Sequence, residues 1–441
     1  MRTALFDPYS FVGDSSTAYA MAHAAGASYV RLPINWRSVA PATQQPGFDA
    51  ADPTSPGYSW SDVDATVAAA EAAGLTPILD IVAPPPKWAF AVRPRGAKAG
   101  TPKASALGQF AKALAIHFDG QHGFPAVRDF EVWNEPNLTL QLSPVAAAAY
   151  RDMVNAVAAS VHAVDRGNLV VAGGLDPFEN QAPRFVAQAP LAYMRALLCV
   201  SKGAHPHSTC KAKVHFDVWS HHPYSFNGPF GDANRTDDVS LGDLPKMRAL
   251  LRAAAKLHRI VSSHPVQFWV TEFSWDTSPP RPHAVPLKLQ GRWTAESLYQ
   301  MWRSGVTVAT WFQLQDRPSP NPYQSGLYFY AKTLAKAKAK PTLTAFSFPF
   351  VAYLGKKSVS IWGRDTTSKK TLVTIQRRRG THGGWRTVAR IRTNRYGIFK
   401  GALKLAATKK DWLRAAAPGD EKSLAFSLTK PKDVRHGPWG N

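Results

Sequence analysis

The sequence predicts a (β/α)₈ barrel followed by a small antiparallel β-sandwich. Eight short, β-rich apolar runs, each followed by an alanine-rich stretch of helical period, occupy about the first 350 residues. Beyond them the pattern changes to short alternating segments separated by Gly, Thr, Asn and Asp. A chain of 441 residues, 45% of them hydrophobic, can bury the cores of one large and one smaller domain.

The eight predicted strands alternate with helices along the chain. They are TALFD (3–7), SYVRLPI (28–34), TPILDIV (76–82), RDFEVWN (128–134), NLVVAG (168–173), VHFDVWS (214–220), QFWVTEF (267–273) and VTVATWFQL (306–314). This alternation favours a parallel barrel with long loops. A doubly wound open sheet is the alternative, but no G-x-G-x-x-G follows the first strand, so its dinucleotide-binding version has no support.

Two of the intervening helices carry start and stop signals. Ser61 and Asp64 suit a capping box, and Gly74 suits the end of the same helix. In the stretch SPVAAAAYRDMVNAVAASVHAV, Ser143 suits the N-cap and Pro144 the first helical position.

The C-terminal region reads as a separate, smaller domain. The stretch KPTLTAFSFPFVAYLG (340–355) is interpreted as the last barrel helix. Six short alternating segments follow: SVSIWGR, TLVTIQRRR, GWRTVARIRT, YGIFKGALKL, DWLRAAA and SLAFSLT. We therefore place the boundary near residue 352, with a barrel over 1–352 and a sandwich over 353–441.

The positive charge is concentrated in the C-terminal region. Residues 331–441 hold 25 Lys and Arg against 5 Asp and Glu, whereas residues 1–330 hold 28 against 25. The basic run RRRGTHGGWR is short and lies among predicted strands, so nucleic-acid binding is not expected. A solvated face, or attraction to an acidic cell-surface polymer, accounts better for this charge.

Two cysteines and the absence of certain segments bear on where the protein acts. Cys199 and Cys210 flank a polar stretch, and in an oxidising environment they would form a disulfide. No apolar run is long enough to span a membrane, and no secretory signal is visible at the start of the sequence. We expect a secreted or cell-surface protein whose export signal lies outside this sequence, with the cytoplasm as the alternative.

Two glutamates at strand ends carry the chemistry. Glu135 follows the fourth predicted strand and Glu272 lies at the end of the seventh. A barrel brings the carboxyl ends of its strands together at one face, where the active sites of such enzymes lie. Two facing carboxylates are what glycoside hydrolysis requires: one protonates the leaving oxygen, and the other attacks or activates water.

Polar side chains at other strand ends suit the same chemistry. Asn134 could hydrogen-bond a sugar hydroxyl, while Arg31 on the second strand and Tyr224 after the sixth could keep Glu272 ionised. His222 stands in the same SHHPYS stretch as Tyr224. No cofactor is needed, because two carboxylates perform both the proton transfer and the covalent step.

The aromatic residues and histidines have structural as well as functional interpretations. Four tryptophans fall at or just beyond strand ends, where indoles can stack on sugar rings: Trp36, Trp88, Trp275 and Trp311. Large aromatics are usually core residues; of the tryptophans, Trp311 is the one we interpret as functional, and Trp219, Trp269 and Trp302 are assigned to packing. The cluster His205, His207, His215, His221 and His222 lacks zinc-like spacing, so no metal is predicted.

The motifs together resemble glycoside hydrolase clan A. VWNEPN, a second strand-end glutamate in VTEF, a strand-two arginine, HPY on strand six and a tryptophan on strand eight are similar to those of family 39 and of cellulase-like family 5 relatives, over roughly residues 3–350. The third strand carries Asp80 where many family 5 members have a histidine, which favours family 39.

The resemblance implies a retaining double displacement on a β-linked sugar. Glu135 would be the general acid/base and Glu272 the nucleophile. Asn134 would hold the 2-hydroxyl, Tyr224 and Arg31 would hold the nucleophile, and Trp311 would form the floor of the subsite. The alternatives are a non-catalytic carbohydrate-binding barrel localised by its cationic sandwich, and polyanion binding as the main activity.

Overall fold

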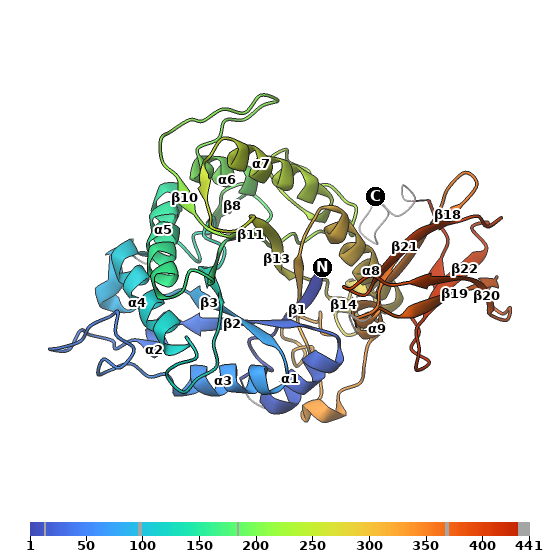
Figure 1. Ribbon diagram of the computed structural model, residues 1–441, viewed down its shortest axis with the longest axis horizontal. Coiled ribbons are helices and arrows are strands. Elements are labelled where there is room, and N and C mark those ends of the chain that lie inside the picture. Colours follow the sequence, from blue (N-terminus) through green and yellow to red (C-terminus); the bar gives the residue numbers. More distant parts are fainter. Residues whose placement is uncertain (13–14, 96–98, 183–184, 367–369, 431–441) are drawn as a thin grey trace.

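Eight parallel strands close into a barrel with helices around it (Figure 1). The computed structural model describes residues 1–12, 15–95, 99–182, 185–366 and 370–430. The barrel strands are β1 (Arg2–Phe6), β2 (Tyr29–Asn35), β3 (Thr76–Val82), β6 (Asp129–Val132), β7 (Leu169–Leu175), β11 (Val218–His221), β13 (Gln267–Phe273) and β16 (Val308–Phe312). Each coincides with one predicted run, and β1 closes the barrel by pairing with both β2 and β16. The predicted (β/α)₈ barrel is confirmed.

The helices lie outside the barrel, between successive strands. They are α1 (Ser15–Ala24), α3 (Ser61–Ala72), α4 (Ala104–His117), α5 (Ala147–Val164), α6 (Pro190–Leu198), α7 (Leu244–Lys256), α8 (Leu287–Arg303) and α9 (Pro341–Ser347), with the short α2 (Trp36–Val39), η1 (Lys87–Ala89), η2 (Leu241–Asp243) and η3 (Leu334–Lys336). Four two-stranded sheets decorate the loops: β4 (Phe90–Val92) with β5 (Thr101–Pro102), β8 (Asn180–Ala182) with β9 (Phe185–Ala187), β10 (Val214–His215) with β12 (Ile260–Val261), and β14 (Thr277–Ser278) with β15 (Val285–Pro286).

Both predicted helix starts are wrong. The N-cap of α3 is the buried Trp60, whose indole donates to the carbonyl of Pro53, so Ser61 is already helical and makes no cap. Helix α5 begins at Ala147, beyond the predicted start at residues 143–144. The stop signal is correct, because Gly74 follows α3 with a φ of +76°.

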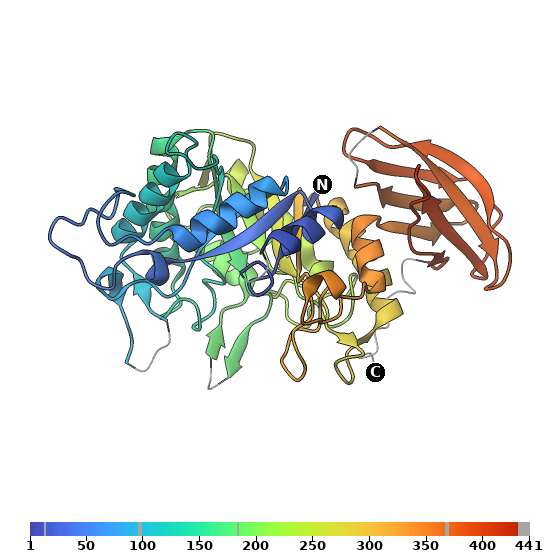
Figure 2. The ribbon, with the colours of Figure 1, turned by 90° about the horizontal axis from the view of Figure 1, so that it is seen from below.

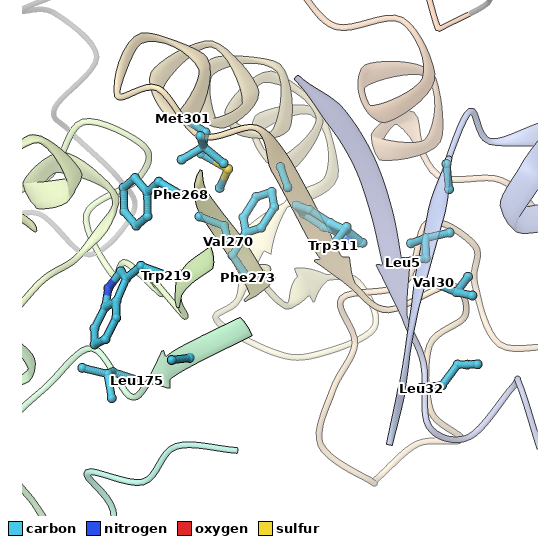
Figure 3. Packing of buried hydrophobic residues seen from close by; sticks show 14 of the residues in the cluster. Leu5, Val30, Leu32, Leu175, Trp219, Phe268, Val270, Phe273, Met301 and Trp311 are labelled. Atoms are coloured by element: carbon cyan, nitrogen blue, oxygen red, sulfur yellow. The ribbon is translucent and has the colours of Figure 1, made fainter. Parts of the chain in front are cut away.

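Strand alternation divides the buried residues into two layers. Ala4, Ile78, Val171, Val218, Trp269 and Val308 fill the lower barrel interior. Residues of opposite parity face outward and pack under the helices; Figure 3 shows Val270 and Trp311 in this outer layer, with Met301 of α8 beside it. Phe273 joins the same layer although it has the parity of Trp269, because the register between β13 and β16 shifts between Val270 and Phe273. Trp219 and Trp269 are buried as predicted, and Trp302 packs against the outer core.

The C-terminal strands form two antiparallel sheets, consistent with the predicted sandwich (Figure 2). One sheet has the order β17 (Phe350–Leu354), β18 (Val359–Arg364), β21 (Ile398–Leu403). The other has the order β20 (Arg386–Arg392), β19 (Leu372–Arg379), β22 (Asp411–Ala416), β23 (Phe426–Ser427). All six segments predicted after the last helix contain a strand.

The last predicted barrel helix is too long. Helix α9 ends at Ser347, and Phe350–Leu354 form β17, which pairs with β18. Residue 352, where the sequence places the boundary, therefore lies within a strand of the C-terminal sheet. A short apolar run that is buried on both faces cannot be told from a buried helix by its periodicity, which explains the error.

Two further features concern covalent and membrane structure. Cys199 and Cys210 are joined by a disulfide, with Cα atoms 5.3 Å apart. Within the described ranges, no helix is both long enough and apolar enough to cross a membrane.

Candidate active site

Glu135 and Glu272 lie on either side of one buried imidazole at the carboxyl end of the barrel. Glu135 follows β6 and Glu272 lies near the end of β13. The Nδ1 atom of His222 is 3.1 Å from Glu135 Oε1 and 4.0 Å from Glu272 Oε2. The two glutamate side chains are 16% and 15% exposed, so both retain access to a ligand. The fold thus brings together the two carboxylates predicted from the sequence.

An unusual backbone presents Glu135. Strand β6 ends at Val132, and both Trp133 (φ +70°) and Glu135 (φ +44°) adopt left-handed conformations. Such conformations cost of order 1–3 kcal/mol in non-glycine residues and cluster at functional sites. The Trp133 indole is anchored on the carbonyl of Gln141, and the Glu135 amide donates to the carbonyl of Gly174. These contacts hold the turn in the conformation that aims the carboxyl group.

The two glutamates occupy unlike electrostatic environments. Burial raises the pKa of Glu135 to about 7, although the charge of Arg31 opposes the shift. Glu272 instead accepts a hydrogen bond from the Tyr224 hydroxyl at 2.5 Å and one from Arg31 Nη1 at 3.2 Å. Two donors, one of them cationic, stabilise a negative charge on Glu272. The two carboxyl groups therefore differ, because burial favours a proton on Glu135 whereas two donors hold Glu272.

His222 is neutral at ordinary pH. Burial lowers its pKa to about 4, and its Nε2 atom lies 3.1 Å from the Thr271 hydroxyl. A neutral imidazole has one N–H donor and one acceptor nitrogen, so it can bridge Glu135 and Thr271 without placing a second positive charge in the site.

Arg31 is fully buried and lies at the centre of the ion pairs of the site. Its guanidinium reaches Glu131 Oε2 at 2.5 Å and Asp80 Oδ2 at 2.8 Å, in addition to Glu272. Burial raises the pKa of Asp80 well above its ordinary value; Arg31 opposes this shift, and the negative charges of Glu131 and Glu272 add to it. Arg31 also donates to the Asn134 amide oxygen at 2.9 Å, so the amide NH₂ is the group that Asn134 can offer to a ligand.

Two further carboxyl residues of the site, Glu131 and Asp176, were not predicted from the sequence. Glu131 accepts from Ser220 as well as from Arg31, and its inward position on an apolar strand could have been found from strand alternation. Asp176 follows β7, and burial together with the charge of Glu135 raises its pKa to about 7. The buried amide of Asn137 holds both backbone groups of Asp176. A third carboxyl group therefore stands beside Glu135, and no sequence motif marks it.

The prediction that Trp311 forms the floor of the site is wrong. Trp311 is 0% exposed, its indole donates to the carbonyl of Ser325, and its ring packs edge-on against Phe273. The next residue, Phe312, has the inward parity and lines a cavity of about 620 Å³ beside Tyr224. The sequence indicated the correct strand end, but alternation along β16 turns the phenylalanine, and not the tryptophan, toward the site.

The remaining tryptophans named from the sequence fall into two groups. Trp275 is largely buried but lines the same cavity as Phe312. Trp36 is fully buried, and the partly exposed Trp88 packs against it and donates to the carbonyl of Pro41. Within the described part of the chain, no group of three His, Cys, Asp or Glu side chains is arranged to hold a metal ion.

Known proteins share both the sequence pattern and the fold. Residues 1–273 match the sequence model described as Cellulase (glycosyl hydrolase family 5). The fold resembles that of a family 39 enzyme from Xanthomonas axonopodis pv. citri (16% identity, TM-score 0.53, 93% of this chain and 92% of that one). It also resembles a monomeric β-xylosidase from Caulobacter crescentus CB15 (16%, 0.52, 93% and 94%) and a glucosidase from Croceicoccus marinus (14%, 0.52, 93% and 93%).

No curated protein gives a significant match to the sequence. The family match extends over more than half of the chain and includes both strand-end glutamates. The match to the family holds although the third strand carries Asp80 in place of the histidine common in family 5. The chain belongs to the cellulase family, glycosyl hydrolase family 5, and is a glycosidase of clan A.

Proposed function

We propose that the protein hydrolyses β-linked glycosides with retention of configuration, through two glutamates in unlike environments. The observation that carries the proposal is the difference between them. Glu135 has a pKa raised to about 7, whereas Glu272 accepts hydrogen bonds from Tyr224 and Arg31. Retaining enzymes need one carboxyl group of each kind, and environments that separate two carboxyl groups in this way assign their roles.

In the first step, Glu272 attacks the anomeric carbon while Glu135 donates its proton to the leaving oxygen. The glycosidic bond breaks, and an ester bond forms between the sugar and Glu272. In the second step, Glu135 takes a proton from water, the water oxygen attacks the anomeric carbon, and Glu272 leaves as the carboxylate. His222, whose Nδ1 atom lies 3.1 Å from Glu135, positions this carboxyl group and adds no charge of its own to either step.

The remaining side chains position the sugar and the nucleophile. The free NH₂ of Asn134 donates to the 2-hydroxyl beside the reacting carbon. Phe312 and Tyr323, which line the cavity next to Tyr224, give the sugar ring an apolar wall. The xyloside and the glucoside are the first substrates to test, because proteins of similar fold include a β-xylosidase and a glucosidase.

The test is azide rescue of Glu135→Ala on a panel of aryl β-glycosides (xyloside, glucoside, galactoside, arabinoside). Loss of the acid/base should reduce kcat/KM by about 10²–10⁴-fold for poor leaving groups. Azide should restore turnover and give a β-glycosyl azide. Azide should not accelerate the parent or Glu421→Ala, which removes an exposed carboxylate of the C-terminal region. An α-configured azide, or no rescue of a folded variant, would contradict the retaining assignment.

The pH profile gives a second prediction. Because burial raises the pKa of Glu135 to about 7, the protonated acid that the first step needs disappears as the pH rises through 7. We expect kcat/KM to fall on the alkaline side with an apparent pKa near this value. In Glu135→Ala, with a dinitrophenyl leaving group that needs no protonation, this alkaline limb should vanish. A limb that persists unchanged would belong to another group.

We further propose that the protein acts outside the reducing cytosol. The disulfide between Cys199 and Cys210 supports this, because such bonds persist in secreted and cell-surface proteins.

A further inference from the structure

One face of the four-stranded sheet collects arginines from three adjacent strands. Side chains directly opposite one another on paired strands share a face, and the register pairs Thr374 with Arg390 and Leu372 with Arg392. Along β19 and β22, it pairs Gln376 with Arg414 and Arg378 with Trp412. The opposite face carries Val373, Ile375, Leu413 and Ala415, all fully buried. We call the outward set of Arg378, Arg390, Arg392 and Arg414 the arginine face.

Two of these arginines converge on one indole. The guanidinium carbon of Arg414 lies 4.2 Å and that of Arg378 lies 4.8 Å from the ring centroid of Trp385. Arg378 also lies 5.9 Å from the ring of Trp412. Stacking fixes the planes of the two guanidinium groups. Arg414 Nε donates to Gln376 Oε1 at 2.8 Å, and the outer N–H groups remain as donors. The rings hold the cations in place, so little side-chain entropy is lost when an anion binds.

Three of the four arginines have no ion-pair partner among the described residues, whereas Arg414 interacts with the charge of Asp420. Among the residues that the structure describes, no carboxylate forms an ion pair with Arg378, Arg390 or Arg392, and the buried Nε of Arg378 has no hydrogen-bond partner. Burial and then the charge of Arg378 lower the pKa of Arg414, and the charge of Asp420 opposes the shift. Two cations held over one ring repel each other, and an anion bound between them would relieve this repulsion.

Protection of a sheet edge explains only part of this pattern. Strand β20 is the edge strand, and charged side chains such as Arg390 and Arg392 keep edges from pairing with other chains. Arg378 and Arg414 lie on β19 and β22, which are paired on both sides, so edge protection does not account for them. The opposite edge strand, β23, is covered, since Arg292 of α8 donates to Ser427.

We propose that the arginine face binds a polysaccharide that carries carboxylate groups. Charge complementarity favours a polyanion, since residues 331–441 hold 25 basic and 5 acidic side chains. Planar guanidinium groups bind carboxylates in a bidentate manner. Alternate residues of a strand place the cations in rows about 7 Å apart, which suits a repeating charge. A single-stranded nucleic acid fits less well, because it needs open aromatic faces for its bases, whereas guanidinium groups cover Trp385.

The choice of a glycan over another polyanion rests on the proposed glycosidase function of the barrel, but binding and catalysis can be measured separately. The experiment uses the full chain with Glu272→Gln, which binds without turnover, and polygalacturonate as the probe. The triple change Arg378→Gln, Arg390→Gln, Arg414→Gln should weaken binding by at least about tenfold, because charge-assisted hydrogen bonds are lost. Raising the salt concentration should also weaken the binding of polygalacturonate by the protein whose arginine face is intact.

A matched control removes the same charge elsewhere. Arg252, Lys256 and Lys288 are exposed on helices α7 and α8, and changing all three to glutamine should alter affinity less than about twofold if the site is local. Equal losses of affinity in the two triple variants would mean that net charge alone controls binding. That result would overturn the assignment of a local site. Tighter binding of single-stranded DNA than of polygalacturonate, or no binding of polygalacturonate at low salt, would also overturn it. Binding that survives while the parent cleaves no glycoside would contradict only the proposed function.

Discussion

Glu272→Gln should abolish glycoside cleavage while leaving the fold intact. The amide keeps the shape of the side chain, and its single oxygen can still accept from Arg31 while its NH₂ group faces the Tyr224 hydroxyl, but it is too weak a nucleophile to form the glycosyl ester. Removal of a catalytic nucleophile lowers kcat by at least about 10⁴-fold in hydrolases of other classes, and we expect a loss of this size here. The measurement is kcat on the aryl glycoside that the parent cleaves best.

The matched control is Glu296→Gln. Glu296 is also buried, on α8, where it accepts from Arg292 and Tyr353 away from the site. Its replacement makes the same chemical change at a buried glutamate and should change kcat by less than about twofold, because the position is distant from the reacting groups. If Glu272→Gln matched the parent in kcat, Glu272 would not be the nucleophile. A parent that binds glycans but cleaves none would support the carbohydrate-binding alternative.

The barrel could be predicted because its signal is repeated. Each of its eight strands is an apolar run of the expected length, and a single error could not disguise the alternation with helices. The ends of individual helices carry a weaker sequence signal. Ser61 has the composition of a cap, but burial of Trp60 sets where the helix begins. Phe350–Leu354 has the composition of a helix end, but pairing with β18 makes it a strand. In both cases long-range contacts decide the local structure.

The site, like the fold, has residues that the sequence predicts and residues that only the tertiary structure identifies. Glu135, Glu272, Arg31, His222 and Tyr224 could be placed together because a barrel gathers its strand ends. The assignment of Trp311 failed because it needed the parity of β16, which a one-residue shift reverses. Val308 fills the barrel interior, so Trp311, three residues later, must face the helices. Asp176 could not be found at all, since only the fold brings it beside Glu135.

The largest effect on stability is expected at Arg31. Arg31→Met removes the single buried cation that faces Asp80, Glu131 and Glu272. Removing one partner of a buried ionic cluster leaves uncompensated charge and costs about 3–5 kcal/mol. The midpoint of urea unfolding should fall accordingly. The activity of the fraction that remains folded should fall by about 10²-fold or more, because Glu272 loses its cationic donor.

A second variant separates the two roles of this arginine. Combining Arg31→Met with Asp80→Asn and Glu131→Gln removes the fully buried part of the cluster and leaves only the partly exposed Glu272. Replacing buried ionic groups by neutral groups that pack well is often nearly neutral in stability. The triple variant should therefore recover most of the lost unfolding free energy yet remain as inactive as Arg31→Met. If it recovered activity together with stability, Arg31 would act only by holding the barrel together. If it recovered neither, Asp80 and Glu131 would support the site independently of Arg31.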